Sequence, residues 1–277
     1  MFAKDLYTDV NGYKTRYWDL GTGDIPILLL HGFALSCELW SLNIEEVSKS
    51  HRVIVLDLWG SGKTDGPPKN IDIELYPEFV FWFLEKLNIK KAKIVGHSMG
   101  GMLALKFALN HPEMVDSLIL VGTAGFQRKI PAHFKIFTFP FVGEIMTKPN
   151  LIGLEHALYK NSFTKHDYLK VYAKILFEFQ LEGNTGKYLL HMARNALDIF
   201  GFKGTLLRKV QRSAAQIKCP VLLVWGYEDK IQHFKSAFKA KKYMPHAQIE
   251  FIEQCGHLPQ IEFPEKFNQI LLNFIDK

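Results

Sequence analysis

The chain has 277 residues, 48% of them hydrophobic and 22% charged, and a net charge of +6. These proportions are typical of a globular protein with a substantial core, built as one large domain or as a domain with an insert. No apolar run reaches the roughly eighteen residues of a membrane-spanning helix, and residues 1–10 lack the apolar core of a signal peptide. We therefore expect a cytoplasmic protein. The net charge is too mild to indicate a nucleic-acid partner, and we expect none.

The three cysteines, Cys37, Cys219 and Cys255, have no paired spacing. They predict neither a disulfide framework nor a metal site, and we expect packing residues or free thiols. The H-E-x-x-H, P-loop and G-x-G-x-x-G patterns are missing from the sequence. We therefore expect no metal and no organic cofactor.

Apolar segments rich in Val, Ile and Leu recur along the chain, most of them separated by helical patterns. We expect strands over Tyr13–Leu20, Ile25–Leu30, Val53–Leu58, Ala92–Val95, Ser117–Val121, Val221–Trp225 and Ala247–Ile252. Helices are expected over Pro77–Leu87, Met99–Asn110, Lys235–Tyr243 and Pro264–Ile275. This alternation predicts an α/β fold with a mainly parallel sheet and helices on both faces. The first two strands have no helix between them, so we expect them to pair antiparallel.

Residues 127–218 interrupt this alternation. They carry no comparable strand signal and predict several helices, which makes them a helical insert between two strands of the sheet. The insert holds 15 Lys and Arg against 6 Asp and Glu, a net charge of +9. Such a charge is compatible with an anionic substrate or a weak peripheral contact with an acidic membrane surface, and equally with a solvated basic face.

The most informative motif is Gly96-His97-Ser98-Met99-Gly100, which follows a predicted strand and opens a predicted helix. G-x-S-x-G in this context is a nucleophile elbow, a tight turn that lifts the serine hydroxyl off the end of a sheet. The positions two before and two after the serine must be small, and glycine stands at both. We therefore predict Ser98 as the nucleophile.

A serine hydroxyl needs a base, usually a histidine that a carboxylate holds in one tautomer. In this architecture the chain order is serine, then the acid, then histidine. We assign the acid to Asp229, in the turn after the strand Val221–Trp225, with Glu228 as its local rival. We assign the base to His257, just past the last predicted strand.

An oxyanion hole completes such a site, because backbone N–H groups must face the charge that develops on the carbonyl oxygen. One N–H belongs to the residue after the nucleophile, Met99. The second comes from a loop after an earlier strand, and we assign it to Phe33 in His31-Gly32-Phe33.

Together these motifs resemble the α/β-hydrolase superfamily. The matching segments are His31-Gly32-Phe33, Asp57-Leu58-Trp59-Gly60-Ser61-Gly62-Lys63-Thr64, Gly96-His97-Ser98-Met99-Gly100-Gly101, Gly226-Tyr227-Glu228-Asp229 and Gly256-His257. We interpret the second segment as structural. The resemblance implies the α/β-hydrolase fold, with a core of residues 1–126 and 219–277 and a helical cap of residues 127–218. It also implies that the cap roofs the active site and shapes substrate choice.

Within the superfamily the chain is similar to the serine-dependent branch of esterases, lipases and carbon–carbon bond hydrolases, whereas haloalkane dehalogenases and epoxide hydrolases use aspartate. The carbon–carbon bond hydrolases, which cleave ring-fission products, often have Trp after the catalytic histidine and Asn before the nucleophile. This chain has Leu258 and His97 at those positions.

We therefore expect a serine hydrolase that cleaves carboxylic esters of apolar or amphipathic small molecules through an acyl-enzyme, most similar to a carboxylesterase or lipase. One alternative is a carbon–carbon bond hydrolase of ring-fission (meta-cleavage) products, in which a basic residue such as Arg194 binds the substrate carboxylate. The other is a ligand receptor that keeps the fold. The sequence predicts no oligomeric state.

Overall fold

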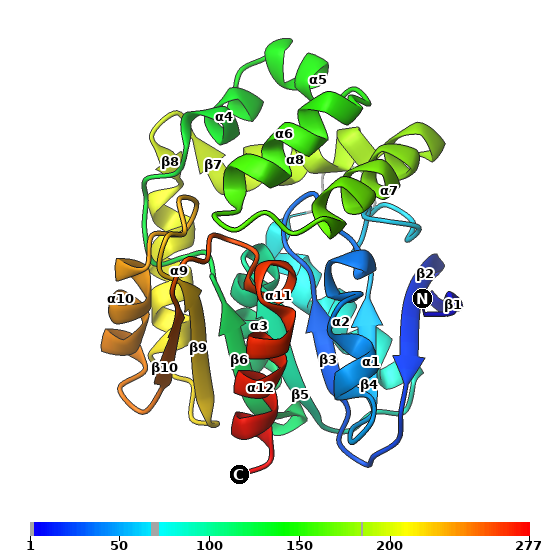
Figure 1. Cartoon of the computed structure of the whole chain (residues 1–277), viewed down its shortest axis with the longest axis vertical. Coiled ribbons are helices and arrows are strands. Elements are labelled where there is room, and N and C mark those ends of the chain that lie inside the picture. The colour runs from blue at the N-terminus through cyan, green and yellow to red at the C-terminus, as the bar shows by residue number, and fades with distance from the viewer. Residues whose placement is uncertain (1–2, 68–71, 184) are drawn as a thin grey trace.

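Figure 1 shows the computed structural model of the chain, which describes residues 3–67, 72–183 and 185–277. Within those ranges an eight-stranded sheet has the order β1-β2-β4-β3-β5-β6-β9-β10. Its strands are β1 (Leu6–Val10), β2 (Tyr13–Leu20), β3 (Ile27–Leu30), β4 (Val53–Leu56), β5 (Ala92–His97), β6 (Val115–Val121), β9 (Val221–Gly226) and β10 (Gln248–Ile252). β2 pairs antiparallel with β1 and β4, and the other neighbours pair parallel. The predicted mainly parallel sheet is confirmed.

The N-terminal strands differ from the expectation in two ways. β1 is an additional strand, whose burial alternates with period two and which pairs only with β2 at the edge of the sheet. β2 and β3 do not pair with each other, so the expected antiparallel pairing of the first two predicted strands is wrong. β3 instead lies between β4 and β5. The chain returns from β3 through α1 (Ile44–Val47) to run parallel beside it, so β4 occupies the edge of β3 and β2 pairs beyond β4.

Helices cover both faces of the sheet, as predicted, and each face has its own hydrophobic core. In β3, Leu28 and Leu30 belong to one core and Ile27 and Leu29 to the other, because successive side chains of a strand point to opposite faces. The first core is covered by α2 (Tyr76–Lys86), α3 (Met99–Asn110) and α10 (Lys235–Tyr243), and the second by α1, α11 (Pro259–Glu262) and α12 (Pro264–Ile275) (Figure 1).

The segment between β6 and β9 is mainly helical, and most of it lies above the sheet in Figure 1. It comprises α4 (Ala132–Lys135), α5 (Val142–Met146), α6 (Leu151–Asn161), α7 (Tyr168–Glu182), α8 (Thr185–Ala196), β7 (Leu197–Asp198), β8 (Gly201–Phe202) and α9 (Gly204–Ala214). β7 and β8 form a short antiparallel pair that the sequence does not predict. α9 packs against α3 and α10, on the flank of the sheet. The division into a core and a cap of residues 127–218 stays a prediction. None of the described helices is both long and apolar enough to cross a bilayer.

The segment that begins at Asp57 has the structural role that the sequence suggests. Asp57 Oδ2 accepts hydrogen bonds from Arg16 Nε at 2.6 Å and from the Lys63 N–H at 3.0 Å. Asp57 Oδ1 accepts the Cys37 N–H at 2.7 Å. Arg16 also forms two hydrogen bonds of 2.9 Å with the carboxylate of Glu38. This buried network joins β2 to the loops that follow β3 and β4.

Candidate active site

The turn between β5 and α3 has the tight geometry that G-x-S-x-G predicts. Ser98 stands between the last residue of β5 and the first residue of α3, at a φ of 54° and a ψ of −111°. A non-glycine residue at positive φ is strained, so its surroundings must hold it there. A Cβ atom on Gly100 would lie 2.5 Å from the carbonyl oxygen of His31, and one on Gly96 would lie 2.5 Å from that of Gly100. Both positions therefore require glycine.

The loops after β9 and β10 bring Asp229 and His257 together. His257 Nδ1 donates a hydrogen bond to Asp229 Oδ2 at 2.7 Å, and both residues are buried. The other oxygen, Asp229 Oδ1, accepts the N–H groups of Ile231 and Gln232 at 2.7 and 2.9 Å. A proton on Nδ1 leaves Nε2 of His257 as the accepting nitrogen, which is the tautomer that a base for serine needs.

Glu228, the rival of Asp229 in the sequence, has a different partner. Its Oε2 accepts the N–H of Cys255 at 2.9 Å, so this carboxylate supports the loop that leads to His257. The carboxylate in contact with the imidazole is that of Asp229.

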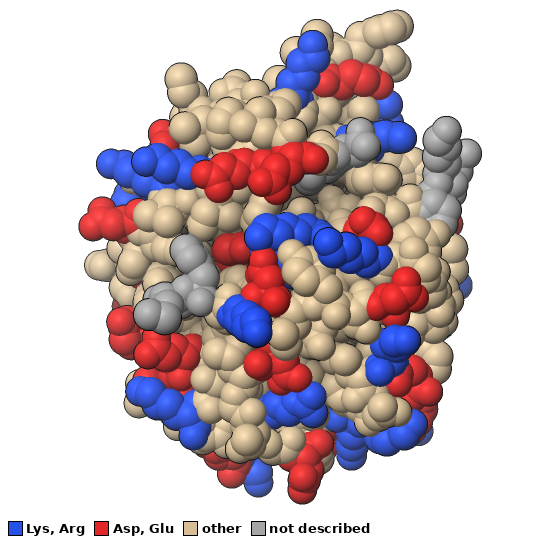
Figure 2. Space-filling view, turned by 90° about the vertical axis from the view of Figure 1, so that its right-hand side faces the viewer, with Lys and Arg blue, Asp and Glu red and all other residues tan. Residues whose placement is uncertain are grey.

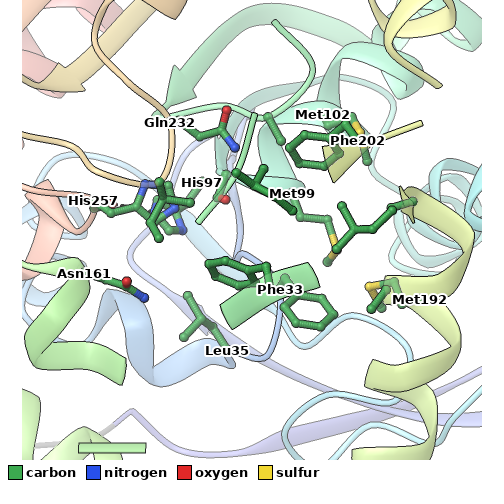
Figure 3. Close-up of a pocket in the computed structure, with 18 of the residues that line it drawn as sticks. Phe33, Leu35, His97, Met99, Met102, Asn161, Met192, Phe202, Gln232 and His257 are labelled. Carbon is green, nitrogen blue, oxygen red and sulfur yellow. Dashed lines mark hydrogen bonds between the residues drawn. The ribbon is translucent and has the colours of Figure 1, made fainter. Parts of the chain in front are cut away.

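Ser98, Met99, Phe33 and His257 line one cavity, shown in Figure 3. Ser98 is half-buried. None of the hydrogen bonds between described residues joins Ser98 Oγ to His257. The structure therefore brings the predicted nucleophile, acid and base to one edge of the sheet, with a hydrogen bond between the acid and the base. Their catalytic roles stay predictions.

The loop that carries Phe33 lies directly against the elbow. A Cβ atom on Gly32 would be 2.8 Å from His97 Nδ1 and 3.2 Å from Ser98 Cβ, so a larger residue would force the two segments apart. Met99 is the first residue of α3, and its N–H has no acceptor within that helix. These positions suit the N–H groups of Phe33 and Met99 to the role of oxyanion donors that the sequence predicts.

His97, the residue before the nucleophile, is fully buried and contacts the base. Its Nε2–H donates to the carbonyl oxygen of His257 at 2.8 Å, and its Nδ1 has no partner among the described residues. Burial, together with the nearby His257 ring, holds the pKa of His97 well below its ordinary value, so this imidazole is neutral at pH 7. Burial likewise lowers the pKa of His31, whose Nε2 accepts the N–H of Leu58 at 3.0 Å.

Glu262, in α11, binds the backbone on both sides of His257. Its Oε2 accepts the N–H of Gly256 at 2.9 Å, and its Oε1 accepts that of Leu258 at 3.1 Å. Oε2 also accepts the N–H groups of residues 163–164 at 2.7 and 2.9 Å. Burial raises the pKa of this carboxyl, although its four backbone donors oppose the shift. One buried carboxylate thus joins the loop of the predicted base to the loop between α6 and α7.

Asn161, at the end of α6, completes this arrangement, because its carbonyl oxygen accepts the N–H of His257 at 2.8 Å. No motif in the sequence indicates Asn161, Glu262 or the contact of His97 with the base. Most of these contacts join distant parts of the chain, 160 positions apart for His97 and His257, and the short-range contacts of Glu262 with the N–H groups of Gly256 and Leu258 follow no recognised sequence pattern.

The cavity has a volume of about 110 Å³ and a divided lining. Figure 3 shows the polar side chains of His257, Gln232 and Asn161 on one side, and Met102, Phe202 and Met192 on the other. No lysine or arginine is among the described residues that line it. Arg194, the candidate from the sequence for a substrate carboxylate, instead forms hydrogen bonds of 2.8 and 3.0 Å with the exposed Glu144. That expectation is therefore wrong for Arg194.

Comparison with known proteins supports this picture. A family model described as the alpha/beta hydrolase fold matches residues 25–140. The dihydrolipoyllysine-residue acetyltransferase component of the acetoin cleaving system of Pseudomonas putida is 31% identical over 97% of this chain and 68% of its own length. The 2-hydroxy-6-oxo-6-(2'-aminophenyl)hexa-2,4-dienoic acid hydrolase of Metapseudomonas resinovorans is 28% identical over 99% and 91%.

Among solved structures, the 2-hydroxy-6-oxo-6-phenylhexa-2,4-dienoate hydrolase of Rhodococcus sp. strain RHA1 has the same fold. It superposes with a TM-score of 0.84 over 99% of both chains, at 18% identity. The sheet, the elbow and these similarities agree with one another. The chain belongs to the family of enzymes that have the α/β-hydrolase fold.

Proposed function

We propose that this hydrolase is serine-dependent and attacks a carbonyl carbon with Ser98. The observation that carries the proposal is the 2.7 Å hydrogen bond between His257 Nδ1 and Asp229 Oδ2, beside the cavity that Ser98 also lines. A receptor that only binds a ligand needs no such pair, which argues against that alternative.

In the proposed reaction, His257 Nε2 takes the proton of Ser98 Oγ while the oxygen attacks the carbonyl carbon. The N–H groups of Phe33 and Met99 donate hydrogen bonds to the oxyanion, and one such donor lowers the barrier by about 3 kcal/mol. Asp229 stabilises the imidazolium. The proton then moves from Nε2 to the leaving atom, and the bond between that atom and the carbonyl carbon breaks. Water, deprotonated by His257, then attacks the acyl-enzyme, and Ser98 Oγ regains its proton as the acid departs.

The relatives favour carbon–carbon bond cleavage over ester cleavage as the specific activity. The Metapseudomonas relative, which matches almost the whole chain, is named as a hydrolase of a substituted hexadienoic acid. In such a reaction the carbonyl is a ketone, the leaving atom is carbon, and the carbon takes the proton. We therefore place the carbon–carbon bond hydrolase first.

Ester cleavage is the second candidate, and the lining of the cavity supports it. A dienoate carries a carboxylate, and a buried anion is costly without a cation or several hydrogen-bond donors. The described lining offers no lysine or arginine, and its polar side chains besides Ser98 and the two histidines are the amides of Asn161 and Gln232. A neutral ester with an apolar acyl group needs no such partner.

The two candidates separate in one experiment. We would compare kcat/KM for 2-hydroxy-6-oxo-6-phenylhexa-2,4-dienoate with that for p-nitrophenyl butyrate, using wild type and Ser98→Ala. A preference of a hundredfold or more for either substrate selects that candidate. Equal turnover by wild type and Ser98→Ala on both substrates would overturn the proposed use of Ser98.

A further inference from the structure

The outer side of the helical insert carries apolar side chains that no described part of the chain covers. Six large side chains within residues 139–152 are 46–83% exposed, and we call them the apolar tip: Phe139, Phe141, Val142, Ile145, Met146 and Ile152. They lie on α5, on the turn before it and at the start of α6, which Figure 1 shows at the top of the molecule. Single exposed hydrophobic residues are ordinary, but six of them in one short stretch are typical of an interaction surface.

The residues just before the apolar tip, and Gly143 within it, face the rest of the protein. Phe134 lines the cavity, and the rings of Phe134 and Phe137 pack edge-on against Phe33 with centroid distances of 6.4 and 6.0 Å. Gly143 of α5 lies so close to Leu190 of α8 that a Cβ atom there would be 2.6 Å from the leucine Cδ1. In α5 the buried position is Gly143, whereas Val142, Ile145 and Met146 are exposed. The rest of the protein therefore covers only one side of α5, and the apolar side chains of its other side are exposed to solvent.

The charges near the apolar tip leave an exposed lysine beside it. Residues 128–155 hold four basic and two acidic side chains, and one of the basic ones, Arg128, is ion-paired with Asp198. Lys148, two residues after the end of α5, is exposed, and the carboxylate of Glu144 within α5 is paired with Arg194. Figure 2 shows the upper end of the molecule as largely uncharged surface, with basic and acidic side chains beside it. An apolar surface next to the exposed Lys148, on an insert with a net charge of +9, complements an interface whose surface is anionic and whose interior is hydrocarbon.

We propose that the apolar tip inserts into the surface of a bilayer that contains anionic lipids. In this arrangement Phe141 and Ile145 enter the headgroup and acyl boundary, and Lys148 contacts the lipid phosphates and carboxylates. The apolar tip has six residues, fewer than the roughly 20 to 30 per partner of a stable protein interface, so it suits this occupant better than a second copy of the chain. The proposal concerns docking and does not depend on which bond the enzyme cleaves.

Sedimentation of the full chain with vesicles tests the proposal directly. We would use vesicles of phosphatidylcholine alone and vesicles with added phosphatidylserine, at low and high salt. Wild type is expected to bind the anionic vesicles, and more weakly at high salt. The double variant Phe141→Ser with Ile145→Ser is expected to bind at least tenfold more weakly. Lys148→Glu is expected to weaken binding about fivefold or more on anionic vesicles only, since one basic residue near such a surface contributes about that factor.

Matched controls separate docking from misfolding and from chemistry. Val171 and Leu181 of α7 are 46% and 62% exposed outside the apolar tip, and their double serine variant is expected to bind as wild type does. The tip variants are expected to keep turnover of a short, water-soluble substrate, and Ser98→Ala is expected to keep vesicle binding. Equal binding by wild type and the Phe141/Ile145 variant, or no binding at low salt, would overturn the proposal. A wild-type dimer that the tip substitutions convert to a monomer, with no vesicle binding, would overturn it in favour of self-association.

Discussion

Replacing Asp229 with asparagine changes the charge and hydrogen-bonding of the predicted acid while leaving its shape almost unchanged. The asparagine Oδ1 can still accept the N–H groups of Ile231 and Gln232, which Asp229 Oδ1 binds at 2.7 and 2.9 Å. The asparagine NH₂ then faces His257 Nδ1, where Asp229 Oδ2 accepts a hydrogen bond at 2.7 Å. Two donors cannot face each other, so the imidazole must move its proton to Nε2.

The expected loss follows from that change of tautomer. With its proton on Nε2, His257 can no longer accept the proton of Ser98. The same substitution in a serine protease with this constellation lowers kcat by about 10⁴-fold, which corresponds to about 5.4 kcal/mol of barrier. We expect a loss of this order for Asp229→Asn. We expect a loss of folding free energy below about 3 kcal/mol, because only the charge-assisted part of one hydrogen bond is removed.

Glu228→Gln is the matched control, because it removes the neighbouring carboxylate, which contacts the Cys255 N–H and not the imidazole. We expect its kcat to stay within about tenfold of wild type, since the bond to the loop can be kept by the amide oxygen. Steady-state kinetics on the better of the two substrates measures kcat, and urea unfolding measures stability. If Asp229→Asn kept more than a tenth of the wild-type kcat while folded, the assignment of the acid would be refuted.

Three further outcomes are expected. Ser98→Ala loses at least about 10⁴-fold in kcat, and a serine-directed phosphonate adds its mass to wild type alone; labelling of the variant would place the nucleophile elsewhere. Glu262→Gln presents an NH₂ group to the Leu258 N–H or to the donors on the other side, which displaces the loop of the base. We expect kcat of this variant to fall by up to about 10²-fold while its KM stays within twofold of wild type. A lower melting temperature with wild-type kcat and KM would contradict this and show that Glu262 only stabilises the fold. Below the ordinary histidine pKa of 6.5, the unfolded chain binds protons that buried, neutral His31 and His97 do not. The free energy of unfolding therefore decreases as the pH is lowered, and between pH 7.5 and 5.5 each of the two histidines accounts for a decrease of up to about 1.4 kcal/mol, which urea unfolding measures. His97→Gln is expected to make this decrease smaller, and an unchanged decrease in the variant would contradict the expectation.

Elements with strong local signals could be predicted from the sequence. The bounds of α3, α10 and α12 agree with the predicted Met99–Asn110, Lys235–Tyr243 and Pro264–Ile275, because each helix is delimited by a turn or by proline at its start. The tight turn at Ser98 and the meeting of Asp229 and His257 at the same edge could also be predicted, since parallel strands place their carboxyl ends at one edge of a sheet; their catalytic roles stay predictions.

Contacts between segments that are far apart in the sequence could not be predicted. The strand that pairs with β2 is β4, whose position depends on how the segment with α1 packs after β3. No residue of β2 indicates this position. The role of Glu262 depends on two loops that meet only in the folded protein. A carboxylate five positions after a histidine carries no recognisable pattern, so its four backbone donors are visible only in three dimensions.

The carboxylate of Glu262 has a consequence for engineering this enzyme. The Glu262 side chain forms hydrogen bonds both with the turn after α6 and with the turn that carries His257. Replacing the helical segment by that of a homologue would therefore displace His257 unless residues 161–164 of this chain were kept. A functional chimera therefore has to keep residues 161–164 together with Glu262. Such a chimera should hold the His257 imidazole in its present position even when the rest of the helical segment comes from a homologue.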